Sequence, residues 1–418
     1  MKKLLVGVVS LALSLGLLSS APLMAEEVPG VAQTEVVASQ ESPTGYYVTF
    51  RYAGEAERVR LQGQWTFSGD RYLNGAPMYP VQPDQWQNGY FVDGNFEIVE
   101  MEKNEEGVFE YTMPLPNGTF SYWFFLNGDE GTETSDVTGA SQTFDPALPP
   151  MVSEGMDASN LQAGSNRSHI YIPLDSSKVL QDRTIEAPRT DGIEGTILYE
   201  SVEVPNGEET ITEPFGIYLP YGFDKERDEP YKVVVLSHGM NGDEFNWPNN
   251  GCAKNILDNL YGTIEDTVFV FPNNTIFSWD LELIHTSIVD CILPFMVENY
   301  NVSEKVEDRV MAGLSMGGMT TTYLMTYHTN DFSAYYPMSG SNFGVWEYTD
   351  EAGFDDMKNV DIAIFSAFQA FDYSDVLKTT QLWTEKEISY NFYVYDGGHT
   401  WEIWRKCLED MVRYELWK

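Results

Sequence analysis

Cysteine, histidine and basic residues are scarce in this 418-residue chain. The three cysteines, Cys252, Cys291 and Cys407, form no Cys-x-x-Cys pair, so the spacing of a structural zinc site is missing and no metal is expected. Lysine and arginine total 24 against 64 aspartates and glutamates, which gives a formal net charge of −40. A chain this acidic repels nucleic acid and anionic membrane surfaces, and those two classes of partner are excluded.

Long hydrophobic runs are also missing, except in the first 25 residues. There, Lys2 and Lys3 precede an apolar stretch over 4–18, and a series of small residues ends at Ala25. A basic start, a short apolar run and a small-residue cleavage point are typical of a secretory signal peptide. A membrane anchor is the alternative, but the run is too short to span a bilayer comfortably. We therefore expect residues 1–25 to be removed and the protein to be secreted, without stable membrane insertion.

Two patterns divide the rest of the chain. After a polar linker over 26–44, short strand-like runs and turn dipeptides fill residues 45–150. Such a series of short strands predicts an all-β sandwich. An irregular connection over 151–195, carrying one strand, follows. From 196 to 418, strand-like runs alternate with amphipathic helical ones, which predicts a mostly parallel sheet with helices on both faces.

The motif Gly-Leu-Ser-Met-Gly at 313–317 points to nucleophilic chemistry. A strand-like run over 309–312 precedes it and a helical run starts at Met316. A sharp strand-to-helix turn lifts a serine hydroxyl above the sheet, and the flanking glycines permit the crowded backbone. We expect Ser315 to be the nucleophile, the alternative being a glycine-rich turn with a bystander serine.

A serine hydroxyl needs a neighbouring base, and the five histidines leave a short choice. His399 follows the last predicted strand, and the chain order of serine before histidine matches the α/β-hydrolase plan. His238 precedes the nucleophile and lies in a different motif. Three histidines are expected to have structural or surface roles: His169, His285 and His328.

The segment Ser-His-Gly-Met-Asn-Gly-Asp at 237–243 follows a strand-like run over 232–236. A glycine turn at this place can aim a backbone N–H at the substrate oxygen. We expect the N–H of Met240 to be one oxyanion donor, with Gly239 as the alternative. The second donor is expected to be the N–H of Met316, because it follows the nucleophile at the start of a helix.

In combination, these motifs resemble the esterase D family, which includes feruloyl esterases, acetyl-xylan esterases and enterochelin-esterase-like proteins. The resemblance covers roughly 185–418 and implies an α/β-hydrolase fold that works without a cofactor. Residues 46–150 resemble, less strongly, the early-set immunoglobulin-like module often found ahead of such esterases. The segments that carry the esterase resemblance are 236–247, 308–319, 338–340 and 397–401.

The triad acid departs from the family pattern. In such esterases it usually lies in a loop after the penultimate strand, and here Ala370 occupies that place. Asp372, two residues further on, is the preferred substitute. Asp375 and Glu347 are the alternatives, since an acid on either loop could also reach His399.

The expected reaction is a two-step acyl transfer on an ester-decorated plant polysaccharide or oligosaccharide. The acid that water finally releases is expected to be ferulic or acetic acid. Expected export supports this substrate, as do aromatic residues near the expected cleft, of which Trp247 and Trp279 are the predicted substrate contacts. Two alternatives stay open. A siderophore esterase fits the family, but the negative charge and the export signal argue against it. A non-catalytic carbohydrate-binding protein is the other, because of the acid missing at Ala370.

Overall fold

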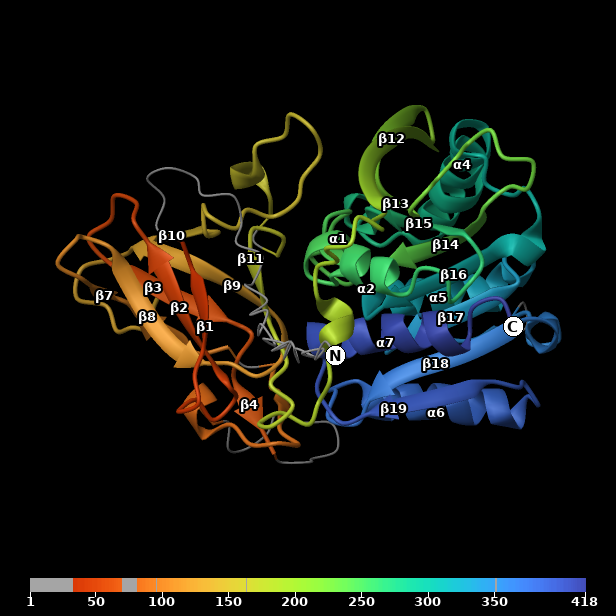
Figure 1. The fold of residues 1–418 in the computed structure, drawn as a ribbon. Helices are drawn as coiled ribbons and strands as arrows, with labels where there is room; N and C mark the ends of the chain where they lie inside the picture. The colour runs from red at the N-terminus through yellow and green to blue at the C-terminus, as the bar shows by residue number, and fades with distance from the viewer. Residues whose placement is uncertain (1–32, 70–80, 95, 163, 350–351) are drawn as a thin grey trace, which may run out of the picture.

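A computed structural model of the chain describes residues 33–69, 81–94, 96–162, 164–349 and 352–418. Within these ranges an all-β body is followed along the chain by an α/β body (Figure 1). No helix in the described ranges is both long and apolar enough to cross a membrane. The expected signal peptide over 1–25 lies outside the described residues.

The first body is a sandwich of two antiparallel sheets with the strand orders β1-β2-β8-β7 and β10-β9-β3-β6. Along β2 the side chains of Val48, Phe50 and Tyr52 alternate inward, as the period of two in a strand requires. They meet side chains of the other sheet, for example Phe50 on Tyr122 with ring centroids 4.8 Å apart. The strands are β1 (Glu35–Ala38), β2 (Tyr46–Tyr52), β3 (Val59–Gly63), β6 (Ile98–Glu100), β7 (Glu102–Lys103), β8 (Phe109–Pro114), β9 (Gly118–Asn127) and β10 (Ala140–Thr143), with a separate pair of β4 (Phe67–Ser68) and β5 (Phe91–Val92).

The sandwich also takes strands from two segments that the sequence pattern left as a linker and a connection. Strand β1 lies within 26–44 and pairs antiparallel with β2. Strand β11 (Ser168–Ile172) lies within 151–195 and pairs antiparallel with β9. Both pairings cover open strand edges. Strand β11 is the one strand predicted within 151–195, whereas β1 carries little hydrophobic pattern and is extended because of its pairing.

The second body is an eight-stranded sheet with the order β12-β13-β15-β14-β16-β17-β18-β19. The hairpin of β12 and β13 is antiparallel and joins β15 antiparallel, and the strands from β15 through β14 to β19 all run parallel. This is the α/β-hydrolase architecture predicted from the sequence. The strands are β12 (Thr196–Asn206), β13 (Glu209–Leu219), β14 (Lys232–Ser237), β15 (Thr267–Pro272), β16 (Arg309–Leu314), β17 (Ala334–Met338), β18 (Asp361–Ala367) and β19 (Asn391–Tyr395).

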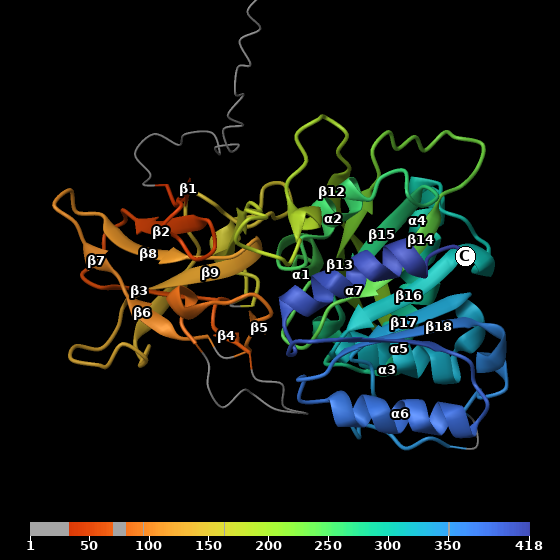
Figure 2. The same cartoon turned by 60° about the horizontal axis from the view of Figure 1, so that its bottom comes forward.

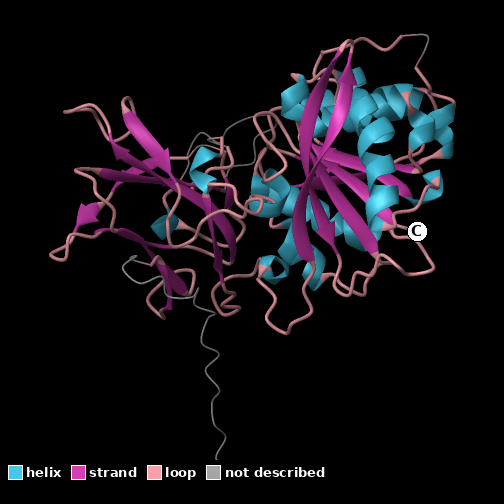
Figure 3. Ribbon diagram, turned by 90° about the horizontal axis from the view of Figure 1, so that it is seen from above, coloured by secondary structure: helices cyan, strands magenta, loops and turns pink. Residues whose placement is uncertain are grey.

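Helices cover both faces of this sheet (Figure 3). They are α1 (Asn246–Asn249), α2 (Ala253–Asn259), α3 (Leu281–Thr286), the π-helical turn η5 (Ser287–Ile292), α4 (Leu293–Tyr300), α5 (Met316–Tyr327), α6 (Tyr373–Glu385) and α7 (Trp401–Tyr414). Val234 and Leu236 of β14 enter one core, under α1, α2 and α7. Val233 and Val235 enter the other, which residues of α3 to α6 line. Figure 2 shows α3, α5 and α6 on the side of the sheet opposite to α7. Alternate side chains of each central strand are therefore buried on opposite faces, as in a fully covered parallel sheet.

A buried ionic network joins the two bodies. Glu186, in the segment between them, accepts a hydrogen bond from the Thr119 N–H of β9 at 2.7 Å and lies 3.4 Å from Nη1 of Arg405 on α7. Burial raises the pKa of Glu186, but the neighbouring guanidinium groups outweigh it and hold the pKa below its usual value. Close by, Glu402 in the first turn of α7 accepts the Val92 N–H of β5 at 2.8 Å. The sandwich therefore bonds directly to the helix that begins two residues after His399.

Candidate active site

Ser315 lies at the turn between β16 and α5, with φ 53° and ψ −117°. A non-glycine residue adopts a positive φ only where its surroundings hold it there. Two bonds do so: the Ser315 N–H donates to the Met338 carbonyl at 2.9 Å, and the Ser315 carbonyl accepts from the Met319 N–H at 2.8 Å. The strained turn leaves the hydroxyl partly exposed above the carboxyl end of the sheet.

The motif glycines allow two backbone segments to touch behind the serine. A Cβ at Gly317 would lie 2.4 Å from the carbonyl oxygen of His238, and one at Gly313 would lie 2.6 Å from the carbonyl of Gly317. Neither contact is sterically possible, so both positions require glycine. The sequence motif thus permits the loop after β14 to pack directly against the nucleophile turn.

His399 connects Ser315 to a buried carboxylate. Its Nε2 lies 2.9 Å from the Ser315 Oγ, and its Nδ1 lies 3.2 Å from the Oδ1 of Asp372. Asp372 is only 1% exposed, and it precedes α6 on the loop that follows β18. Carboxyl ends of parallel strands meet at one edge of a sheet, which is why residues 27 and 84 positions from His399 converge there.

The other acids considered from the sequence lie elsewhere. Asp375 forms an ion pair with Lys378 at 2.7 Å, and Glu347 is exposed on the loop after β17, without a contact to His399 in the described residues. Ala370 is fully buried in the core under α7. In the described residues, Asp372 Oδ2 has no hydrogen-bond partner, so this carboxylate has the His399 imidazole as its side-chain partner. The geometry therefore selects Asp372 over Asp375 and Glu347.

Two aromatic side chains hold the imidazole plane of His399. Trp404 of α7, which is buried, packs edge-on against it with ring centroids 4.8 Å apart. Phe371, on the loop between β18 and α6, has its ring centroid 4.6 Å from that of His399, and its side chain is 64% exposed. The ring is confined between a core residue and a surface residue, with Nε2 directed at Ser315.

His238 supports the neighbouring loop rather than the nucleophile. Its Nδ1 lies 2.6 Å from the Gly239 carbonyl, and its Nε2 accepts the Asn274 N–H at 3.2 Å. Burial lowers the pKa of His238 to about 4, so the ring is neutral and Nδ1–H donates to Gly239. The sequence placed His238 in this motif without assigning it a role.

The orientation of the Gly239 carbonyl bears on the predicted oxyanion donors. In a trans peptide the C=O and the next N–H point in opposite directions, so holding the Gly239 carbonyl against His238 turns the Met240 N–H away from that ring. A Cβ at Gly239 would lie 3.2 Å from the Ser315 Cβ, which places this turn beside the nucleophile. In the part of the chain that the structure describes, the Met240 and Met316 N–H groups have no protein acceptor. Both remain free for a ligand, and their role stays a prediction.

The prediction that Trp247 contacts substrate is wrong. Its side chain is 0% exposed, its Nε1 donates to the Ser237 carbonyl at 3.0 Å, and its ring packs edge-on against Trp401. This indole is buried between α1 and α7, where it fills the core and hydrogen-bonds the end of β14. It therefore cannot contact a substrate at the surface. Trp279 is partly exposed and lies edge-on to His238 at 5.7 Å, so its contact with substrate stays a prediction.

Four exposed apolar side chains lie on loops that follow the parallel strands β14, β15, β17 and β18, at the carboxyl edge of the sheet where Ser315 also lies. Apolar side chains at this edge can line a ligand site in an α/β fold. Aliphatic residues on turns carry no sequence signal for this role. The side chains are Met240, Ile276, Val345 and Phe371.

Residues 212–414 match the sequence model of the family Esterase. The chain is 28% identical over 211 residues to an endo-1,4-beta-xylanase/feruloyl esterase of Xylanibacter ruminicola. The alignment covers 47% of this chain and 28% of that protein. It is also 28% identical over 160 residues to endo-1,4-beta-xylanase Y of Acetivibrio thermocellus, covering 35% of this chain and 14% of that protein. The chain thus spans less than a third of the length of these curated relatives.

The fold is similar over both bodies to a crystal structure of the enterobactin esterase of Shigella flexneri. The TM-score is 0.55 at 16% identity, and the alignment covers 91% of this chain and 95% of that one. Fold and site together define an α/β hydrolase with a serine–histidine–aspartate arrangement. Within that class, the family whose sequence model residues 212–414 match is Esterase, described as putative esterase.

Proposed function

We propose that the protein is a serine carboxylic-ester hydrolase. The observation that carries this proposal is the continuous line of contacts from Ser315 Oγ through both nitrogens of His399 to the buried Asp372. A serine becomes nucleophilic when a neutral imidazole accepts its proton, and a carboxylate on the other nitrogen fixes the tautomer and stabilises the imidazolium. This arrangement also argues against a decayed, non-catalytic binding protein, because the acid missing at Ala370 is replaced by Asp372.

The reaction proceeds in two balanced steps. Ser315 Oγ attacks the ester carbonyl carbon while His399 Nε2 takes the hydroxyl proton, and the carbonyl electrons form an oxyanion facing the N–H groups of Met240 and Met316. When the oxyanion collapses, the bond to the alcohol oxygen breaks and His399 returns the proton to that oxygen. Water then repeats the sequence on the acyl-enzyme, which releases the acid and regenerates Ser315.

For the substrate we propose a feruloyl or similar aromatic acyl ester on a plant cell-wall polysaccharide. The exposed apolar side chains of Met240, Ile276, Val345 and Phe371, on loops at the edge of the sheet that carries Ser315, suit an aromatic acid better than a charged one. The name of the Xylanibacter relative combines xylanase and feruloyl esterase, which supports the same class. The sequence pattern of residues 1–25 supports action outside the cell.

A siderophore ester is the second candidate, because the two-body similarity to the enterobactin esterase extends over the sandwich as well as the hydrolase body. The formal charge of −40 opposes binding of an anionic iron complex. The two candidates differ in one measurable ratio: kcat/KM for methyl ferulate against kcat/KM for a catecholate serine ester.

The nucleophile is tested first with p-nitrophenyl acetate and a fluorophosphonate probe. Ser315→Ala should abolish both hydrolysis and labelling while the circular dichroism spectrum stays unchanged. Ser333→Ala is the matched control, because Ser333 precedes β17 at the opposite edge of the sheet. Wild-type turnover in Ser315→Ala would overturn the assignment of the nucleophile.

A further inference from the structure

Two of the histidines for which the sequence predicted only structural or surface roles lie against each other at the far end of α5. His285 is on α3, and His328 directly follows α5, the helix whose first residue follows Ser315. Their rings are stacked with centroids 3.6 Å apart and planes inclined by 20°. Both imidazoles are partly buried, so they form a defined pair rather than two mobile surface side chains.

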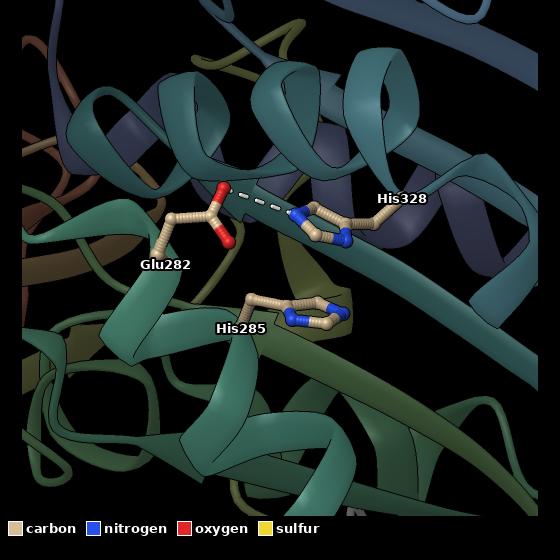
Figure 4. Close-up of side chains that lie close together, drawn as sticks. All are labelled: Glu282, His285 and His328. Carbon is tan, nitrogen blue, oxygen red and sulfur yellow. Dashed lines mark hydrogen bonds and ion pairs between the residues drawn. The ribbon is translucent and has the colours of Figure 1, made fainter.

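A carboxylate completes the group, as Figure 4 shows. Glu282, one turn before His285 on α3, has its Oε1 3.2 Å from Nε2 of His328. One nitrogen from each histidine and one oxygen of Glu282 all lie within 4.8 Å of one another. The group therefore offers two nitrogen ligands and one oxygen ligand converging from two helices.

The backbone around these side chains is already fixed. Asp280 accepts the Leu283 N–H at 3.1 Å and caps the start of α3. The His328 N–H donates to the Leu324 carbonyl at 2.7 Å, and its own carbonyl accepts the Tyr335 hydroxyl at 2.9 Å. Because this backbone is fixed, metal binding has to order only side-chain torsions, which limits its entropic cost.

We propose that Glu282, His285 and His328 bind one divalent transition-metal ion, with Zn²⁺ as the fitting example. Two imidazoles and one carboxylate are a ligand set that zinc accepts, whereas Ca²⁺ and Mg²⁺ take oxygen ligands. Bonds of about 2.0–2.1 Å in a tetrahedral site bring ligand atoms to about 3.3 Å from each other. The three side chains must therefore close by roughly an ångström or a little more, which rotation about their own bonds supplies.

The stacked geometry sets how binding must proceed. A metal lies in the plane of each imidazole that it binds, and two nearly parallel rings 3.6 Å apart cannot share one in-plane ion. One ring therefore turns about its Cβ–Cγ bond, a torsion that is broad for histidine. Asp331, whose Oδ2 lies 2.8 Å from Nε2 of His285, is placed to hold that ring through its other nitrogen or to become a fourth ligand.

A metal at this place joins α3 to the end of α5 and acts on stability rather than on the ester bond. Ser315 and His328 stand at opposite ends of the twelve-residue helix α5, so the ion would not touch the reacting atoms. An ion that binds only the folded chain raises the melting temperature, by roughly 3–6 °C at a hundredfold excess over the dissociation constant.

The test uses the full chain, stripped with EDTA and dialysed, and Zn²⁺ alone as the probe. We expect one bound zinc per chain by equilibrium dialysis with elemental analysis, a higher melting temperature, and no gain in hydrolysis of p-nitrophenyl acetate. His328→Gln and Glu282→Gln should each lose that zinc and the thermal shift. Glu298→Gln, which makes the same change at an exposed position of α4, should keep both.

A separate variant distinguishes this site from the catalytic histidine, which can also attract zinc. His399→Ala should still bind one zinc at the α3–α5 site. Absence of zinc binding by the wild type at micromolar metal would overturn the proposal. It would be overturned equally if His399→Ala lost the zinc while His328→Gln and Glu282→Gln, folded by circular dichroism, retained it.

Discussion

The Nδ1 of His399 lies 3.2 Å from the Oδ1 of Asp372, a carboxylate two residues beyond Ala370, where the family resemblance led us to expect the acid. The loop after β18 compensates for the two-residue offset, because it buries Ala370 in the core and places Asp372 directly before α6. The path of this loop therefore brings a carboxylate to His399 although the expected position holds an alanine.

Asp372→Asn should lower kcat for p-nitrophenyl acetate by about 10³–10⁴-fold, since an amide cannot stabilise the imidazolium and favours the wrong tautomer. Asp375→Asn, three residues away in an exposed ion pair, is the matched control and should stay within about twofold of wild type. A comparable loss in Glu347→Gln with none in Asp372→Asn would show that the loop after β17 supplies the acid instead.

His238→Phe should lower kcat by about 10²-fold with little change in KM, because it frees the Gly239 carbonyl and with it the peptide that carries the Met240 N–H. His238→Asn keeps a side-chain donor near that carbonyl and should recover part of the loss. Steady-state kinetics well below the melting temperature separate this effect from the stability cost of the unpaired Asn274 N–H. Equal losses in both variants would argue that His238 only fills the core.

Glu213 on β13 predicts a pH dependence of stability. Burial raises its pKa to about 8, even though the Ser287 hydroxyl and the Asn273 N–H donate to its carboxyl group. Because the folded pKa lies above the unfolded value, this group stabilises the fold fully below about pH 4.5. That contribution is lost as the pH rises to about 8, at no more than about 1.4 kcal/mol per pH unit.

Glu213→Gln should therefore gain stability relative to wild type as the pH rises from 5 to about 8, measured as the free energy of unfolding in urea. Glu209→Gln, an exposed position on the same strand, should follow the wild-type profile. A pH profile of Glu213→Gln parallel to wild type would mean that Glu213 is ionised in the folded protein throughout this range.

Arg405→Ala should destabilise the protein by about 3–5 kcal/mol, because it leaves the buried Glu186 with one guanidinium partner fewer and removes donors to the Thr119 and Asn250 carbonyls. Arg413→Ala removes an exposed pair with Glu409 on the same helix and should cost less than about 1 kcal/mol. Thermal unfolding of the full chain compares the two, and similar shifts would show that the joint between the bodies contributes little.

Much of the hydrolase body could be predicted from the sequence, because its strands are buried on both faces and read as short apolar runs. Strand β14 begins at the predicted residue 232 and ends at Ser237, one residue beyond the predicted run, and β16 begins at the predicted residue 309 and extends two residues beyond 312. Strand β12 has only Val204 buried among its eleven residues, so it shows little core pattern and gains its order from pairing with β13. Pairing partners that are far apart in sequence leave no local signal.

The site residues also differ in whether local sequence alone predicts them. Ser315 and His399 are placed by motifs whose backbone requirements are local, such as the turn that needs glycine at 313 and 317. The choice of Asp372 required the path of a whole loop, and the sequence could only rank it first among three acids. The mistake at Trp247 arose because composition reveals an aromatic side chain but not which way its ring points.

Strand β19 and helix α7 close the sheet last in chain order, and His399 lies on the link between them. The contact between His399 and Ser315 spans 84 residues, and that between Arg405 and Thr119 spans 286. A nascent chain that ends before residue 399 therefore has a nucleophile turn but no base. All strands of the sandwich are present once β11 has been synthesised, but its contacts with Glu402 and Arg405 form only after α7 has been synthesised. On the proposed mechanism, ester hydrolysis therefore requires that the chain be folded through α7, the same helix whose docking joins the two bodies.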